Sequence, residues 1–108
     1  MSLSRIEQIK SFLEQKPNDP FLHFALALEH LKLDDSATAK AIFNQLLQEQ
    51  PDYVGTYYHL GKLLEQEKAY EQAFEVYQKG IATATRANDR HAAQELRGAY
   101  QMLSDELL

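Results

Sequence analysis

The sequence predicts an all-α protein of about six antiparallel helices, joined as repeated hairpins. Residues of matching size and polarity recur 34 positions apart, and apolar residues recur with the period of a helix. Only 4 Gly and 3 Pro occur among 108 residues, which leaves little room for long loops. The length fits one domain, residues 1–108.

Two full repeats carry the self-similarity, over residues 19–50 and 53–87. The pairs separated by 34 positions each conserve size and polarity. They are Pro17 and Pro51, Phe24 and Tyr58, Leu26 and Leu60, Ala27 and Gly61, Ala39 and Ala73, Phe43 and Tyr77, and Leu47 and Ile81.

The opening segment, residues 4–16, predicts one helix. Ser4 and Glu7 form the pattern of a capping box at its start. Ile9 and Phe12 match Phe43 and Leu46 of the first repeat at the same offset. We therefore interpret this helix as the second half of a truncated repeat.

The first repeat predicts two helices. Asp19 and Pro20 supply an N-cap acceptor followed by a proline at the first helical position. A tight turn at 34–36 separates the two helices, and Pro51-Asp52 is expected to end the second helix and to cap the next. The expected buried stripes are His23, Leu26, Ala27 and His30, then Ala39, Ile42, Phe43, Leu46 and Leu47.

The second repeat follows the same pattern. Its stripes are Tyr57, Leu60, Gly61 and Leu64, then Ala73, Val76, Tyr77, Gly80 and Ile81. Thr85 stands where a proline would end the helix, so we expect this helix to continue toward Ala87 or Asn88. Residues 89–107 predict a final capping helix. Arg97 there occupies the place of Ala27 and Gly61, which suits a terminal cap without close packing.

These spacings resemble the tetratricopeptide repeat (TPR) family, in particular short stand-alone bacterial members. The run Tyr57-Tyr58-His59-Leu60-Gly61, followed by Leu64, Tyr70, Ala73, Tyr77 and Ile81, carries the resemblance. The resemblance implies a right-handed α-α superhelix whose first helices line a concave groove that binds a peptide or protein segment. The groove residues it implies are Phe21, Phe24, Leu28, Leu31, Lys32, Tyr58, Lys62, Glu65 and Gln94.

The helix expected from Phe21 to Leu33 is apolar nearly all round. Because Leu26 and Ala27 already form its core stripe, Phe21, Phe24, Leu28 and Leu31 are surplus and need a cover. The opening helix is one candidate, above all for Phe21, and a bound partner is the other. We expect Phe24 and Leu28 to face the groove at least partly.

Composition argues against several other functions. Cysteine is absent, the net charge is -5, and no phosphate-binding glycine loop or nucleophile elbow occurs. The four histidines lack metal-ligand spacing. We therefore expect no enzyme, no metal or other cofactor, no nucleic acid and no membrane partner. The start of the sequence lacks the apolar core of a signal peptide, so we expect a cytoplasmic protein.

Two alternatives to peptide binding remain, and one class of peptide partner does not fit the sequence. The chain can be a self-associating structural unit or a fragment of a longer solenoid, with a contact through Leu103, Leu107 and Leu108 of the last helix. RNA binding by a related α-repeat is disfavoured by the 34-residue period and the acidic balance. The carboxylate clamp of some TPR domains needs Lys or Asn at the positions of Phe24, Leu28 and His59, and none matches.

Overall fold

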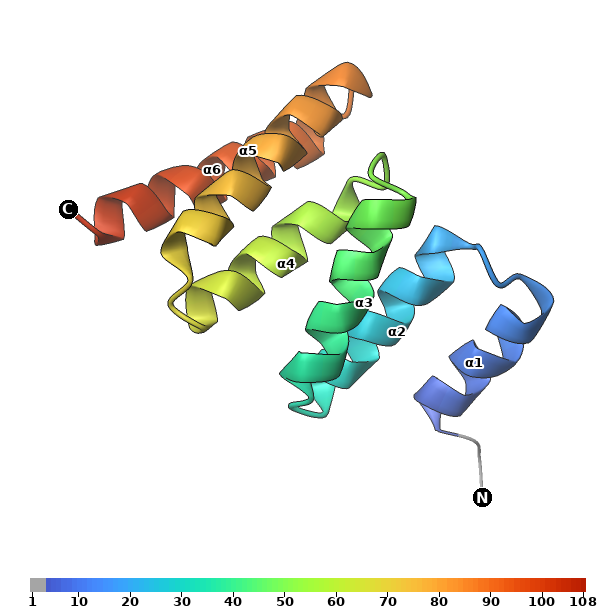
Figure 1. The fold of residues 1–108 in the computed structure, drawn as a ribbon. Helices are drawn as coiled ribbons and strands as arrows, with labels where there is room; N and C mark the ends of the chain where they lie inside the picture. Colours follow the sequence, from blue (N-terminus) through green and yellow to red (C-terminus); the bar gives the residue numbers. More distant parts are fainter. Residues whose placement is uncertain (1–3) are drawn as a thin grey trace. The chain divides into compact units, whose positions relative to one another are not determined.

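The computed structural model describes residues 4–108, which contain six helices and no strand (Figure 1). The helices are α1 (Arg5–Gln15), α2 (Pro20–Lys32), α3 (Ser36–Glu49), α4 (Gly55–Gln66), α5 (Tyr70–Arg86) and α6 (Arg90–Glu106). The prediction of an all-α protein with about six helices is therefore confirmed.

The chain divides into two compact units. The N-terminal unit ends at Tyr53 and contains α1, α2 and α3, and the C-terminal unit spans Val54–Leu108 and contains α4, α5 and α6.

Side chains cap four of the six described helices, from Ser4, Asp19, Asp35 and Asp89. The Ser4 hydroxyl accepts from the Glu7 N–H at 3.1 Å, and it also donates to the Glu7 carboxylate at 3.0 Å. The Asp19 carboxylate accepts from the Phe21 N–H at 2.9 Å, with Pro20 as the first helical residue. Asp89 caps α6 by accepting from the Ala92 N–H at 3.0 Å. Each cap satisfies an N–H that the helix leaves unpaired.

Three of the five connections between the described helices, at 34, 68 and 88, share one geometry. Asp34, Lys68 and Asn88 each have φ between 59° and 63°, in the left-handed region. The next residue then donates its N–H to a carbonyl five positions back at 2.9 Å, for example from Ala69 to Leu64. This bond closes a helix end of the Schellman type, which holds the following helix beside the preceding one.

The cap expected at Asp52 is absent. Helix α4 begins at Gly55, and its N-cap residue Val54 makes no side-chain capping bond. The Tyr53 N–H instead donates to the Gln50 carbonyl at 3.0 Å, which closes a turn over Pro51-Asp52. Asp52 therefore lies two residues before the N-cap, where its carboxylate has no helical N–H to accept from. The prediction that Asp52 caps this helix was wrong.

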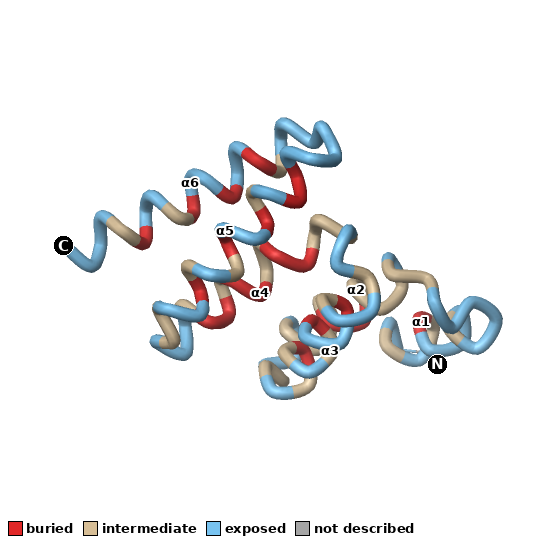
Figure 2. The backbone as a smooth tube through the Cα atoms, turned by 45° about the horizontal axis from the view of Figure 1, so that its top comes forward, coloured by how far each residue is buried: buried red, intermediate tan, exposed pale blue. Residues whose placement is uncertain are grey.

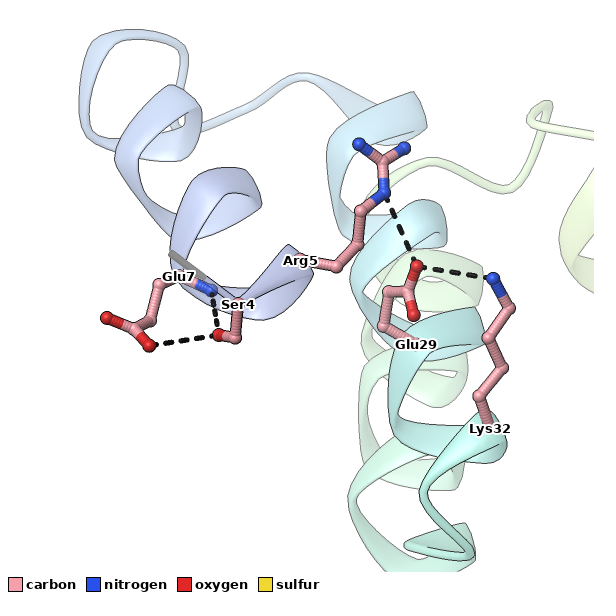
Figure 3. Close-up of polar contacts among 5 residues, drawn as sticks. All are labelled: Ser4, Arg5, Glu7, Glu29 and Lys32. Atoms are coloured by element: carbon pink, nitrogen blue, oxygen red, sulfur yellow. Dashed lines mark hydrogen bonds and ion pairs between the residues drawn. The ribbon is translucent and has the colours of Figure 1, made fainter. Parts of the chain in front are cut away.

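The N-terminal unit buries one face of each of its helices. The core consists of Ile9, Leu26, Ala27, Ala39, Phe43 and Leu46. Where α1 meets α2, Arg5 pairs with Glu29 at 3.4 Å, and Lys32 reaches the same carboxylate at 3.3 Å (Figure 3). Both cations are largely exposed, so each pair contributes little to stability.

The C-terminal unit packs around two glycines. The ring of Tyr77 on α5 lies against Gly61 of α4, while Tyr57 of α4 and Leu96 of α6 lie against Gly80 of α5. Buried positions accordingly recur along the facing sides of α4, α5 and α6 (Figure 2). The absence of a side chain at each glycine leaves room for the neighbouring aromatic ring.

The last helix is more buried than expected. Leu103 is only 2% exposed, so the prediction that α6 exposes this side chain was wrong. One buried stripe of α6 consists of Ala93, Leu96, Ala99 and Leu103. Beside it, the ring centroid of Tyr100 lies 4.9 Å from that of Phe74 on α5. Leu107 and Leu108 are exposed, as expected.

Candidate functional site

The predicted site residues of α2 differ in how far they are exposed. Phe21 is 60% exposed, so α1 does not cover most of this ring. Leu28 and Leu31 are half-buried. Lys32 extends into solvent and pairs with Glu29 of its own helix. Phe21 is thus the large apolar side chain that α2 offers most openly.

Phe24 is held within the N-terminal unit. Its ring centroid lies 6.2 Å from that of Phe43 on α3 and 5.5 Å from that of Tyr53. The side chain is half-buried, so it lies between the core and the surface. Such tilted aromatic pairs add packing energy beyond the area they bury. Phe24 therefore has a structural role in addition to any contact with a ligand.

Three predicted site residues form one row on α4. Tyr58, Lys62 and Glu65 follow the spacing i, i+4, i+7, which places them on one helical face. The Lys62 ammonium lies 5.8 Å from the centre of the Tyr58 ring and 3.8 Å from the Glu65 carboxylate. All three side chains are half-buried. We call Tyr58, Lys62 and Glu65 the α4 row.

Tyr77, which was not among the predicted site residues, holds Glu65 at the end of the α4 row. The hydroxyl of Tyr77, on α5, donates a hydrogen bond to the Glu65 carboxylate. Burial and the adjacent Glu65 carboxylate both raise the pKa of Tyr77 above its ordinary value, so the hydroxyl stays protonated as a donor. Glu65 is therefore held from two sides, by Lys62 and by Tyr77. Sequence reasoning identified Tyr77 as a core residue but not as a partner of Glu65.

Gln94, the remaining predicted site residue, has different neighbours from those of the α4 row. It lines a hollow of about 300 Å³ where the end of α5 meets the start of α6, together with Arg90 and Arg97. The sequence prediction included neither arginine. The sequence does contain a signal for this cluster, because three of the four arginines in the chain, Arg86, Arg90 and Arg97, lie close together along it.

The histidines have ordinary hydrogen-bonding roles. A ring nitrogen of His23 lies 2.7 Å from the Pro17 carbonyl, and His30 lies 3.2 Å from the Asp35 carboxylate. Between residues 4 and 108, no three side chains of metal-binding type gather in one place. None of the six described helices is long and apolar enough to cross a bilayer.

Paired helices, left-handed turns at matching places and a small residue facing an aromatic ring together define an α-helical repeat protein. Residues 22–53 and 54–84 match the family model of the tetratricopeptide repeat. The chain belongs to the tetratricopeptide repeat family. Members of this family commonly mediate interactions between proteins and are generally non-catalytic scaffolds. No curated protein matches the chain.

Solved structures agree with this assignment. A tetratricopeptide repeat domain protein from Salinibacter ruber is 42% identical in its crystal structure, with a TM-score of 0.79, over 82% of this chain and 98% of that one. A solution structure of a domain protein with the same description is 44% identical, with a TM-score of 0.78, over 81% of this chain and 88% of that one. The solution structure of a protein from Bordetella parapertussis shares the fold at 22% identity, with a TM-score of 0.81, over 97% of this chain and 91% of that one.

Proposed function

We propose that this chain is a non-catalytic interaction module that binds a peptide or protein segment on the first helices of its repeats. In the C-terminal unit the α4 row carries the proposal. In the N-terminal unit, α2 contributes the exposed ring of Phe21 and the half-buried Leu28 and Leu31.

The observation that supports this function is that contacts within the protein already order the side chains of the α4 row. Lys62 is placed over the Tyr58 ring and beside Glu65, and Tyr77 holds Glu65 from α5. Side chains that are already ordered lose less entropy when a ligand binds, so they favour affinity. The row combines an aromatic face, a cation and a carboxylate, which suits backbone amides and mixed side chains of a peptide.

A selected peptide tests the proposal. Peptides are selected on the wild-type protein from a random displayed library, and their Kd values are then measured by calorimetry. We expect Tyr58→Ala combined with Lys62→Ala to weaken binding by about ten-fold or more, which corresponds to about 1.4 kcal/mol. Circular dichroism checks that the variant keeps its helices, and Lys62→Gln alone serves as a milder change.

Matched controls come from the second helices of the repeats. Gln48→Ala on α3 and Glu75→Ala on α5 change exposed side chains of similar polarity, and they should leave Kd within about two-fold. Phe21→Ala reports on the α2 surface separately. Unchanged affinity in both the double α4 variant and Phe21→Ala would contradict the proposed function.

Self-association through α6 is the second candidate. Met102 is 60% exposed and Leu107 is 48% exposed, although Leu103 is buried and unavailable. A symmetric contact would cover these side chains. Sedimentation equilibrium decides the point, because a strict monomer at high concentration removes this candidate.

A further inference from the structure

The residues that line the hollow between α5 and α6 differ in chemistry from those of the α4 row. Ala84 and Ala93 are buried at its base, and Arg90, Gln94 and Arg97 stand on its α6 side. The two alanines let another chain approach the helices closely, while the α6 side chains present two guanidinium groups. This combination suits a segment that brings negative charge.

The charges of the hollow are not neutralised within the C-terminal unit. Neither the Arg90 guanidinium nor the Arg97 guanidinium makes an ion pair or a hydrogen bond within the described range 4–108. Arg86, just outside the lining, donates to the Thr83 hydroxyl at 3.4 Å. Asp89 is the acidic residue of the lining, and its carboxylate is used in capping α6. Two guanidinium charges therefore face one carboxylate in a protein whose net charge is -5.

The repeat position of Arg97 indicates which face of α6 is open. On α4 the corresponding position is Gly61, and the ring of Tyr77 covers it. On α6 the corresponding Arg97 is exposed, and Gly98 beside it has no side-chain atom within 4 Å of where its Cβ would lie. No described helix thus takes the place on α6 that α5 takes on α4.

We propose that this hollow is a docking site for an acidic protein segment whose carboxylates pair with Arg90 and Arg97. Guanidinium groups bind carboxylates through two parallel hydrogen bonds. The arginines are seven residues apart on one helix, which separates them by about 10 Å along its axis. A segment with two carboxylates at about that spacing engages both. This inference goes beyond the proposed function, because it concerns different residues and a defined partner chemistry.

A carboxylate partner fits better than a nucleic acid. Nucleic-acid binding draws its affinity from many cations that displace counterions along the phosphates. Here two free guanidinium groups stand beside Asp89 in a chain of net charge -5. The local field therefore suits two carboxylates rather than a continuous polyanion.

A designed peptide tests the site. The probe is a blocked peptide of ten residues with glutamate at every third position, which spaces the carboxylates by about 10 Å when it is extended. The matched control replaces each glutamate with glutamine. We expect the glutamate peptide to bind about ten-fold more tightly than its control and to weaken as salt rises. Equal binding of the two peptides, or binding by neither, overturns the proposal.

Variants of the protein assign the binding to the hollow. Arg90→Gln with Arg97→Gln should reduce glutamate-peptide binding to the level of the glutamine peptide. Lys10→Gln with Lys79→Gln removes the same charge from exposed positions of α1 and α5, and it should change Kd by less than about two-fold. Asp89→Asn keeps a residue that caps helices well and removes the lining carboxylate, so binding should tighten. Equal loss in both double variants overturns the proposal, because it indicates a general charge effect.

Two further measurements exclude other occupants. If inorganic phosphate or a short oligonucleotide binds the hollow more tightly than the glutamate peptide, the carboxylate assignment is wrong. If sedimentation velocity shows a dimer that the arginine double variant abolishes, the occupant is a second copy. The α4 variants Tyr58→Ala and Lys62→Ala should leave the acidic peptide's Kd unchanged, so failure of this proposal is distinguishable from failure of the proposed function.

Discussion

The ring of Tyr77 lies so close to Gly61 that a Cβ at that position would stand 2.2 Å from Cε1 of the tyrosine. This distance is far below van der Waals contact, so α4 and α5 approach each other only because the residue is glycine. The same ring continues to a hydroxyl that donates to Glu65. One contact therefore links the core of the C-terminal unit to the α4 row.

Gly61→Ala should destabilise the protein. Alanine favours a helix over glycine by about 1 kcal/mol, but overpacking against the buried Tyr77 ring costs about 1–3 kcal/mol. We expect the free energy of unfolding in urea to fall by up to about 2 kcal/mol. Gly98→Ala is the control, because nothing lies within 4 Å of its Cβ. It should raise stability by about 0.5–1 kcal/mol, and a similar loss in both variants would contradict the packing explanation.

The raised pKa of Tyr77 makes stability fall at alkaline pH. The unfolded chain loses this proton near its ordinary pKa of 10.0, whereas the folded state keeps it to higher pH. Above pH 10 the native state thus binds more protons, so the free energy of unfolding decreases as pH rises. Urea denaturation of wild type and Tyr77→Phe between pH 8 and about 11 measures this. The stability difference between them should shrink above pH 10, and a constant difference would contradict the assignment.

His59 should make stability fall on the acid side. Burial lowers the pKa of His59 below its ordinary 6.5, and the charge of Glu95 opposes this shift in part. The native state therefore favours the neutral ring, so its contribution is present above pH 6.5 and is lost as pH falls below that value. The urea midpoint of wild type should decrease from pH 7 to about 5 more steeply than that of His59→Gln. Parallel curves would show that other groups account for the decrease.

Two aspartates near helix starts differ in their expected effect. Asp19 caps α2 through the Phe21 N–H, so Asp19→Ala should lower the free energy of unfolding by about 1 kcal/mol. Asp52 precedes α4 without capping it, so Asp52→Ala should stay within about 0.5 kcal/mol. Thermal or urea unfolding measures both. A larger loss at Asp52 than at Asp19 would contradict the cap assignment.

Local sequence patterns determined the helices and most of their ends. The cap at Asp19, the turn after Asp34 and the continuation of α5 past Thr85 all depend on neighbouring residues along the chain, and the structure has each of them. The burial of Gly61 and Tyr77 was also indicated, because both lie on predicted buried stripes. These features follow from backbone hydrogen bonding and side-chain size.

Only the tertiary structure decided which neighbour covers each side chain. The periodicity of α6 could not show that Leu103 is buried, and the residue types at 52 could not show that α4 begins three positions later. The hold of Tyr77 on Glu65 and the free guanidinium groups of Arg90 and Arg97 likewise depend on how two helices meet. Periodicity specifies the face of a single helix, whereas exposure and charge pairing depend on the distance to a second helix.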